Sequence, residues 1–217
     1  MYRRLFPYFL LIVVVFTLLT SCSTMRPVEF EQISEELMIQ IARDQDDYLS
    51  AMKDKNISEL LTFHSITYGS FTESDSSEML VLFKVKDVPH VGGLDRTIAA
   101  IYDANTYLLK SQKTFVADYV SLQLLTDKNQ RKNILYIGSV TYQGYTAYSM
   151  ELFEIEGDRW LSKAISSEAF MENDAYAYTN EILQVFDLSY SDHAPVYDYK
   201  YTLYWDSTEA TFRREMP

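Results

Sequence analysis

The spacing of apolar residues changes once along this chain, and the change separates a predicted helix from a region of predicted strands. Between residues 29 and 53 the apolar positions recur every three, four or seven residues. They are Phe30, Ile33, Leu37, Ile41, Tyr48 and Met52. This spacing places one apolar stripe along a helix, and the glutamates near its start suit the positive end of the helix dipole. We therefore predict one amphipathic helix over residues 29–53.

From Leu60 onward, short segments alternate between apolar and polar residues or are rich in β-branched and aromatic side chains, which is typical of strands. These segments are 79–85, 96–102, 107–109, 115–125, 134–137, 148–155 and 160–161. Short polar turns separate them, as in hairpins. The chain is accordingly predicted to be mainly β, with an antiparallel meander.

Two of the predicted turns are similar to each other. Residues 102–108 and 155–161 each contain an apolar residue, a polar turn, an aromatic residue and then leucine, and residues 205–212 hold a looser third copy. A period of about 50 residues is the length of one four-stranded propeller blade. Chance is the alternative, because every hairpin needs apolar flanks around a polar turn. The predicted sheet is thus a sandwich, an open meander or a degenerate propeller.

The C-terminal part of the chain gives two further predictions. The stretch near 170–186 contains Phe170, Tyr178, Ile182 and Phe186 with few β-branched residues, which favours a second helix. Residues 197–205 alternate at first and then become apolar, and a polar turn separates them from 211–214. This pattern predicts a final hairpin.

The first 22 residues have the order of an export signal. Arg3 and Arg4 precede an uncharged, largely apolar stretch, which ends in Leu19-Thr20-Ser21-Cys22. This order resembles the lipobox of bacterial lipoproteins, in which an aliphatic residue stands three places before the cysteine with small residues between them. The resemblance covers residues 1–22 only. An uncleaved membrane-spanning helix is the alternative.

The lipoprotein resemblance implies a covalent lipid anchor. A diacylglyceryl group would be attached to the Cys22 sulfur, and a signal peptidase would cut between Ser21 and Cys22. Two acyl chains are enough for a stable attachment, whereas one is marginal. The implied organisation is a signal peptide at 1–21, a lipidated tether at 22–28 and a single β-rich extracytoplasmic domain with an N-terminal helix at 29–217.

The implied destination depends on the envelope of the host. Ser23 is not the aspartate that retains lipoproteins at the inner membrane. We therefore expect the protein on the extracytoplasmic side of the cell membrane in a host with one membrane, and at the outer membrane in a host with two.

Composition narrows the range of partners. The 217 residues include 19 Lys and Arg against 31 Asp and Glu, a net charge of −12. Such a surface is unsuited to nucleic acid, which binds cationic proteins. Cleavage after Ser21 would also remove Arg3 and Arg4, leaving 17 basic and 31 acidic residues and a net charge of −14. Cys22 is the only cysteine, so no disulfide forms within the chain.

One turn carries a resemblance to a calcium site. Residues 127–133 lie between two predicted strands, and with their flanks from 119 to 138 they resemble the calcium loops of integrin-type FG-GAP repeats. A hard cation needs several oxygen ligands and usually a glycine at the bend. Here only Asp127, Asn129 and Asn133 offer side-chain oxygens, no glycine is present, and three basic residues add positive charge. We predict an ordinary exposed turn and no bound metal or cofactor.

A glycine-containing loop supplies the first candidate ligand site. His90 lies beside Gly92 and Gly93, with Asp95 and Arg96 following, in a loop where backbone amides could approach a ligand. The alternative is a hairpin turn that needs positive φ. Neither His90 nor the other two histidines, His64 and His193, has a partner at zinc-ligand spacing.

The eighteen tyrosines supply the second candidate. Tyr197, Tyr199 and Tyr201 alternate along one predicted strand, which places them on one face. Another three tyrosines, at 142, 145 and 148, surround a glycine turn at Gly144. Aromatic rows can stack on sugar rings or anchor a protein, and they also fill half-buried sheets. An envelope protein and a cell-wall glycan are therefore the expected classes of ligand.

Local motifs for catalysis are missing from the sequence. There is no Gly-x-Ser-x-Gly, and Cys22 would be consumed by lipid. Paired acids such as Glu154 and Glu156 would matter only across a cleft. The sequence therefore favours a non-catalytic binding or accessory module of the envelope. The alternative is a lipid-anchored hydrolase whose site is assembled from scattered residues.

Overall fold

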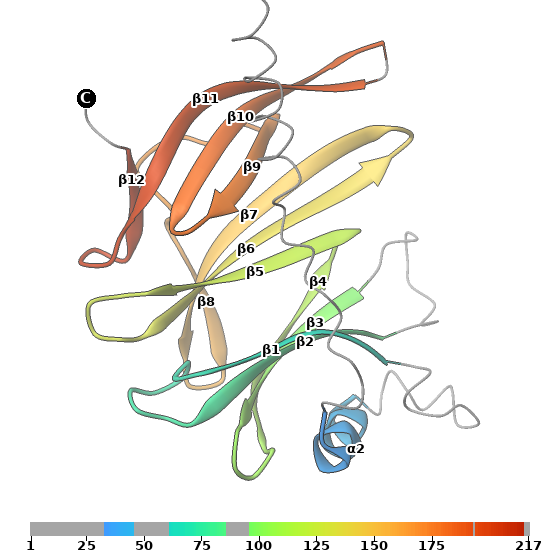
Figure 1. Cartoon of the computed structure of the whole chain (residues 1–217), viewed down its shortest axis with the longest axis vertical. Coiled ribbons are helices and arrows are strands. Elements are labelled where there is room, and N and C mark those ends of the chain that lie inside the picture. Colours follow the sequence, from blue (N-terminus) through green and yellow to red (C-terminus); the bar gives the residue numbers. More distant parts are fainter. Residues whose placement is uncertain (1–32, 46–60, 86–95, 193, 215–217) are drawn as a thin grey trace, which may run out of the picture.

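The computed structural model describes residues 33–45, 61–85, 96–192 and 194–214, and these residues confirm that the chain is mainly β (Figure 1). One helix, α2 (Glu35–Asp44), precedes three four-stranded antiparallel sheets, each built from consecutive strands. The first sheet contains β1 (Leu61–Gly69), β2 (Glu78–Val85), β3 (Arg96–Asp103) and β4 (Leu109–Val116). The second contains β5 (Tyr119–Thr126), β6 (Lys132–Tyr142), β7 (Tyr145–Glu156) and β8 (Arg159–Lys163). The third contains β9 (Asp174–Thr179), β10 (Ile182–Ser191), β11 (Ala194–Asp206) and β12 (Thr211–Arg214).

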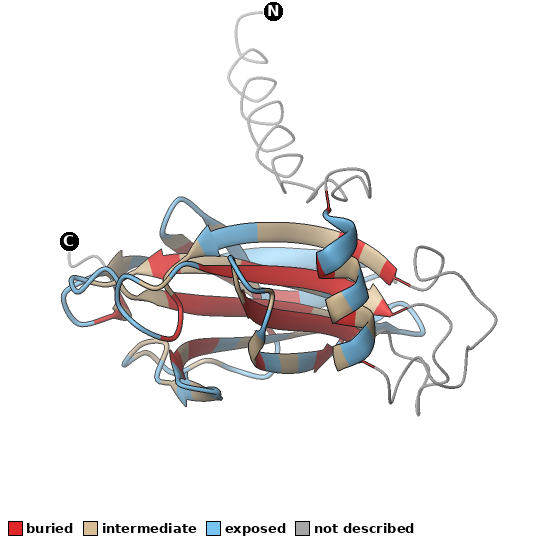
Figure 2. Ribbon diagram, turned by 90° about the horizontal axis from the view of Figure 1, so that it is seen from below, coloured by how far each residue is buried: buried red, intermediate tan, exposed pale blue. Residues whose placement is uncertain are grey.

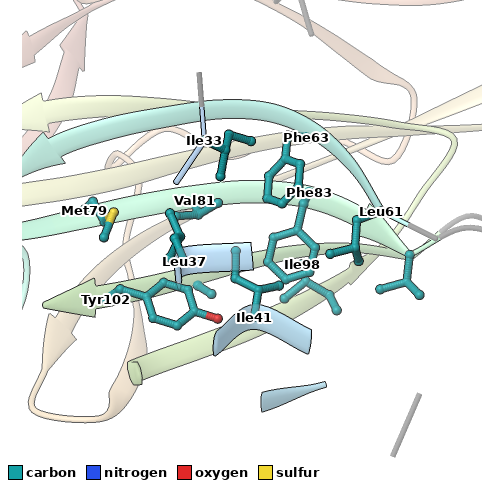
Figure 3. Packing of buried hydrophobic residues seen from close by; sticks show 12 residues of the cluster. Ile33, Leu37, Ile41, Leu61, Phe63, Met79, Val81, Phe83, Ile98 and Tyr102 are labelled. Atoms are coloured by element: carbon teal, nitrogen blue, oxygen red, sulfur yellow. The ribbon is translucent and has the colours of Figure 1, made fainter. Parts of the chain in front are cut away.

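Three apolar layers hold these elements together. In the first layer, Leu37 and Ile41 of α2 pack on the outer face of the first sheet, around Phe83 (Figure 3). The second layer joins the first and second sheets and the third joins the second and third sheets. The middle strands of the first two sheets, β2, β3, β6 and β7, each supply two layers because successive side chains point to opposite faces. Val81 lies in the first layer and its neighbour Leu82 in the second.

The predicted N-terminal helix is confirmed over its central part. The Ser34 hydroxyl caps its start by accepting the Leu37 N–H at 3.2 Å. The helix ends at Asp44, because Gln45 has left helical geometry. A single helix continuing to residue 53 is therefore wrong. The outer parts of that prediction, 29–32 and 46–53, lie outside the described residues, as do the lipobox and the tether.

The predicted helix near 170–186 is wrong, because this region forms a hairpin of β9 and β10. Asn180 and Glu181 both have positive φ, which is the geometry of a two-residue turn that suits the twist of strands. Tyr176 and Tyr178 alternate with alanines and pack into the third apolar layer. Side chains alternate with a period of two along β9, as in a strand, although the apolar spacing over 170–186 had favoured a helix.

The three similar turns lie at equivalent places in the fold. Residues 102–108 join β3 to β4, residues 155–161 join β7 to β8, and residues 205–212 join β11 to β12. Each is the connection between the third and fourth strands of its sheet. In number and order of strands each sheet matches one propeller blade. Within the described part of the chain, no helix has the length and apolar character to span a membrane.

Candidate binding surface

Two hairpins from different sheets bring their tips together. The β6–β7 hairpin turns at Gln143 and Gly144, which both have positive φ. Tyr142 and Tyr145 face each other directly before and after this turn. The tip of the β10–β11 hairpin lies on the same side of the molecule (Figure 1). Residues that are far apart in the sequence therefore come together where the β6–β7 hairpin ends.

Tyrosines make the contacts between the two tips. The Tyr190 hydroxyl accepts a hydrogen bond from the Thr146 N–H and donates one to the Thr146 carbonyl. The Tyr145 and Tyr190 rings meet edge to face, with centroids 4.8 Å apart. The Tyr148 and Tyr197 hydroxyls are 3.2 Å apart. Because β8 pairs with β7 only from Leu152 onward, Tyr190 takes up backbone hydrogen bonds at an edge that β8 does not reach.

These residues form what we call the tyrosine surface. It consists of Tyr142, Tyr145, Tyr148, Tyr190, Tyr197 and Tyr199. Tyr142 is 71% exposed and Tyr199 60% exposed. Tyr145 and Tyr197 are also exposed. A cluster of exposed rings with hydroxyl groups offers apolar area and hydrogen bonds at small entropic cost, which suits recognition.

A β-bulge divides the row of tyrosines on β11. Val185 of β10 pairs with Tyr201, but the next residue, Phe186, pairs with Tyr199, so Lys200 is an extra residue. Successive residues of β10 point to opposite faces, and opposed residues share a face. Tyr199 and Tyr201 therefore lie on opposite faces. The prediction that Tyr197, Tyr199 and Tyr201 share one face is wrong for Tyr201.

Tyr201 is half-buried at the margin of the third apolar layer. Its ring packs against the third apolar layer, and the Arg214 guanidinium lies 4.8 Å from the ring centroid. Its hydroxyl donates to the Ala169 carbonyl at 3.3 Å. Burial raises its pKa. Tyr201 therefore supports the sheet beneath the tyrosine surface.

A charged pair holds the bulge in place. The Lys200 ammonium lies 2.6 Å from Asp174 Oδ1, and the Asp174 side chain is fully buried. Asp174 Oδ2 accepts the Met171 N–H at 2.9 Å. The bond to Asp174 raises the pKa of Lys200, so its charge is retained. Burial, and then the Asp174 carboxylate, raise the pKa of the neighbouring Tyr176 to about 12.

The candidate loop at His90 stays a prediction. His90 and Asp95 lie outside the described residues. Arg96 begins β3, opposite Val116 in the first sheet, and is partly buried. The tyrosine surface is built from the second and third sheets, so Arg96 belongs to a different part of the fold.

The turn after β5 uses its carboxylate for its own backbone. Asp127 Oδ1 accepts the N–H groups of Asn129, at 2.8 Å, and Arg131, at 2.9 Å. Gln130 has positive φ where the calcium loops have glycine. Among the residues that the structure describes, no three His, Cys, Asp or Glu side chains gather as metal ligands would.

The paired acids of β7 are held by basic residues. Arg131 lies 2.6 Å from one oxygen of Glu154, and Lys163 lies 3.1 Å from the other. Glu156 is 3.9 Å from Arg159. Glu154 is thus fixed between two cations and joins β7 to β8 and to the turn after β5, whereas the Glu156 pair is exposed. A general acid or base needs a carboxyl group that gains and loses its proton readily, which adjacent cations oppose.

Sequence reasoning missed Tyr190 and Lys200. Tyr190 lies two residues before a turn residue, Asp192, which has positive φ. A tyrosine close to a hairpin turn is a usable signal for an exposed tip. Nothing in the sequence marks Lys200 as a bulge, because its partner Asp174 is 26 residues away.

Comparisons with protein-family models, with curated proteins and with solved structures gave no match to this chain.

Proposed function

We propose that this protein is a lipid-anchored, extracytoplasmic envelope protein whose β-rich domain binds another envelope component through the tyrosine surface. The observation that carries the binding role is the meeting of two hairpin tips from different sheets in one exposed group of tyrosines. The order of charge, apolar stretch, small residues and Cys22 supports the anchor.

The geometry favours binding over catalysis. The surface tyrosines interact with each other and with backbone, as in a pre-formed recognition surface. Rigid aromatic side chains lose little entropy on binding, so they contribute well to affinity. The paired acids Glu154 and Glu156 face basic partners. The proposed role is therefore to bind or to steady a partner in the envelope.

The anchor is tested by metabolic labelling with a palmitate analogue. The wild-type chain is expected to incorporate label and to partition with membranes, and Cys22→Ser is expected to lose both. Mass spectrometry should find diacylglyceryl on Cys22 as the N-terminal residue. An unlabelled chain with residues 1–21 still attached would contradict the anchor.

The binding role is tested in cells with a photoreactive amino acid placed at Tyr142 or at Tyr68. Tyr68 is the matched control, because it is 70% exposed but lies on β1 in the first sheet. A cross-linked adduct is expected from position 142 and not from position 68. Equal or absent cross-linking at both positions would contradict binding through this surface, and turnover of a cell-wall substrate would favour the hydrolase.

A further inference from the structure

We propose that the edge of β11 at residues 195–199 binds an extended, uncharged protein segment, which adds to the third sheet as an antiparallel strand. This inference rests on the proposed binding function and names the way in which the partner is held. It starts from the unequal lengths of two neighbouring strands. β11 has 13 residues, but β12 has four and pairs only with 203–206 (Figure 1). We call the stretch 195–199 the open edge.

The register of the β10–β11 hairpin shows which backbone groups point out of the open edge. Ser191 and Ala194 flank a two-residue turn, so they form a hydrogen-bonded pair. Backbone groups of successive residues point alternately to the two sides of a strand, so those of residues 195, 197 and 199 point away from β10. Pro195 agrees with this assignment, because it has no N–H to donate to β10.

No described residue bonds to these outward groups at Tyr197 and Tyr199. Among the described residues, β12 is the strand that pairs on this side, and it ends opposite Leu203. Outside the β10–β11 ladder, Tyr197 and Tyr199 make their contacts through side chains, such as the hydroxyl contacts with Tyr148 and Thr202. The backbone of the open edge can therefore pair with a further strand.

The open edge is also more accessible than the other edges. Residues 194–199 are all exposed. The other outer strands of six or more residues, β1, β4, β5 and β9, each contain buried residues. β7 is likewise uncovered over part of its length, but there the Thr146 N–H and carbonyl are bonded to the Tyr190 hydroxyl. A ligand therefore reaches unpaired backbone most readily at β11.

An extended polypeptide matches this edge, because it presents N–H and C=O groups at the same spacing. β12 shows the antiparallel arrangement on the same strand, and a docked segment would continue in its direction toward the hairpin tip. Tyr197 and Tyr199 are opposite Leu188 and Phe186 in the ladder, so this face offers aromatic and apolar neighbours and no charge. Uncharged β-branched or aromatic residues would pack best beside them.

A second copy of the chain fits the open edge less well. Each chain has a net charge of −12, so two copies repel each other. Pro195 and the bulge at Lys200 also limit pairing to a short stretch, as expected of an edge protected from self-association. A short segment of another protein meets neither obstacle.

The test uses the full chain in phosphatidylcholine nanodiscs and a fluorescein-labelled heptapeptide, Thr-Val-Thr-Tyr-Thr-Val-Thr, with binding followed by fluorescence anisotropy. The matched control peptide has the same side chains but is N-methylated throughout, so it cannot donate backbone hydrogen bonds. We expect it to bind about tenfold more weakly. Equal binding of the two peptides, or no binding of the unmodified one, would contradict strand addition.

Two substitutions at one position separate backbone from side chain. Tyr197→Ala and Tyr197→Pro both remove the ring, but only proline removes the outward N–H, and this N–H makes no bond to β10. We expect Tyr197→Ala to weaken heptapeptide binding about threefold and Tyr197→Pro about thirtyfold. Circular dichroism confirms that both variants are folded. Equal losses would mean that the ring holds the peptide and the edge does not.

Two further results distinguish this inference from the proposed function. In cells, the adduct from position 142 should persist in Tyr197→Ala and be lost in Tyr197→Pro. An adduct that both variants retain overturns strand addition and leaves the proposed function intact, whereas no adduct from the otherwise wild-type chain removes the function itself. A dimer in analytical ultracentrifugation that Tyr197→Pro dissociates would assign the open edge to a second copy and overturn the inference.

Discussion

The first and third sheets have the same strand order but different surroundings, and their sequences differ accordingly. The first sheet is covered by α2 on one face and by the second sheet on the other, so six consecutive residues of β2, from Glu78 to Phe83, are buried. Figure 2 shows buried residues along the strands beside the helix and exposed residues in the loops at their ends. In the third sheet, β11 is exposed over its first six residues. Cover on two faces makes a strand uniformly apolar, whereas an uncovered end of a strand is free to carry recognition residues.

The largest expected effect comes from the buried core of the first sheet. Phe83→Ala in the first sheet removes a fully buried ring, and we expect a loss of about 4 kcal/mol in the free energy of unfolding. Tyr199→Ala in the third sheet removes an exposed ring and should cost about 0.5 kcal/mol or less. Urea denaturation followed by tryptophan fluorescence measures both values. Similar losses would show that the two sheets are covered alike.

The next effect concerns the bulge that separates the two faces of the third sheet. Lys200→Met leaves the buried Asp174 carboxylate without its cation, and we expect a loss of about 3 kcal/mol. Hydrogen exchange should also increase in residues 186–199, since the bulge sets their direction. Arg159→Gln is the control, because its ion pair with Glu156 is exposed and should contribute about 0.5 kcal/mol or less. Unchanged stability of Lys200→Met would mean that the bulge needs no charged anchor.

A smaller effect is expected in the layer between the first and second sheets. A Cβ at Gly138 would lie 2.5 Å from Tyr136 Cζ, and the Tyr136 ring stacks on Phe115 at 4.4 Å. Gly138→Ala should therefore cost about 2 kcal/mol through overpacking. A Cβ at Gly69, another strand glycine, would be 3.4 Å from its nearest neighbour, so Gly69→Ala should cost less than half as much. Thermal denaturation compares the two variants, and equal costs would contradict the packing argument.

The smallest effect is a pH dependence within the first sheet. Burial of Glu78 favours its protonated form, but hydrogen bonds from Thr72 and from the Phe71 N–H outweigh this and lower its pKa below the ordinary 4.5. The carboxylate therefore adds stability above pH 4.5, and this is lost as the pH falls through the lowered pKa. Glu78→Gln should cost about 1.5 kcal/mol at neutral pH.

The pH profile supplies the decisive readout for Glu78. The stabilities of the wild type and of Glu78→Gln should approach each other in acid, because the wild type alone loses the contribution of this carboxylate. Glu73→Gln, in the loop between β1 and β2, alters an exposed acid and should change stability by less than about 0.5 kcal/mol. A constant difference between wild type and Glu78→Gln across the acid range would contradict the role of the ionised form.

The sequence predicted the meander well because its signals are local. Alternation and turn residues lie within a few positions of each other, so strands such as β3 and turns such as that at Gly144 could be located. The prediction of a second helix near 170–186 is wrong because Asn180 and Glu181 adopt positive φ and turn the chain into a hairpin, which apolar spacing does not reveal. The tyrosine surface was predicted in two separate parts. They come together only in the folded chain, where the Tyr148 hydroxyl of β7 meets the Tyr197 hydroxyl of β11, and no local pattern contains that information.

The strand order of the three sheets has a consequence for how the protein opens. Each sheet consists of four consecutive strands, and no strand of one sheet pairs within another sheet. Apolar layers, helped by a few backbone hydrogen bonds such as that from the Lys128 N–H to the Ser207 carbonyl, couple one unit to the next, so cooperativity passes along the stack from neighbour to neighbour, as in repeat proteins. The last unit has a sheet on one side only among the described residues, so fraying should begin there. The bonds between Tyr190 and Thr146 tie the tip of this unit to the second sheet, so fraying is expected to start at its other strands.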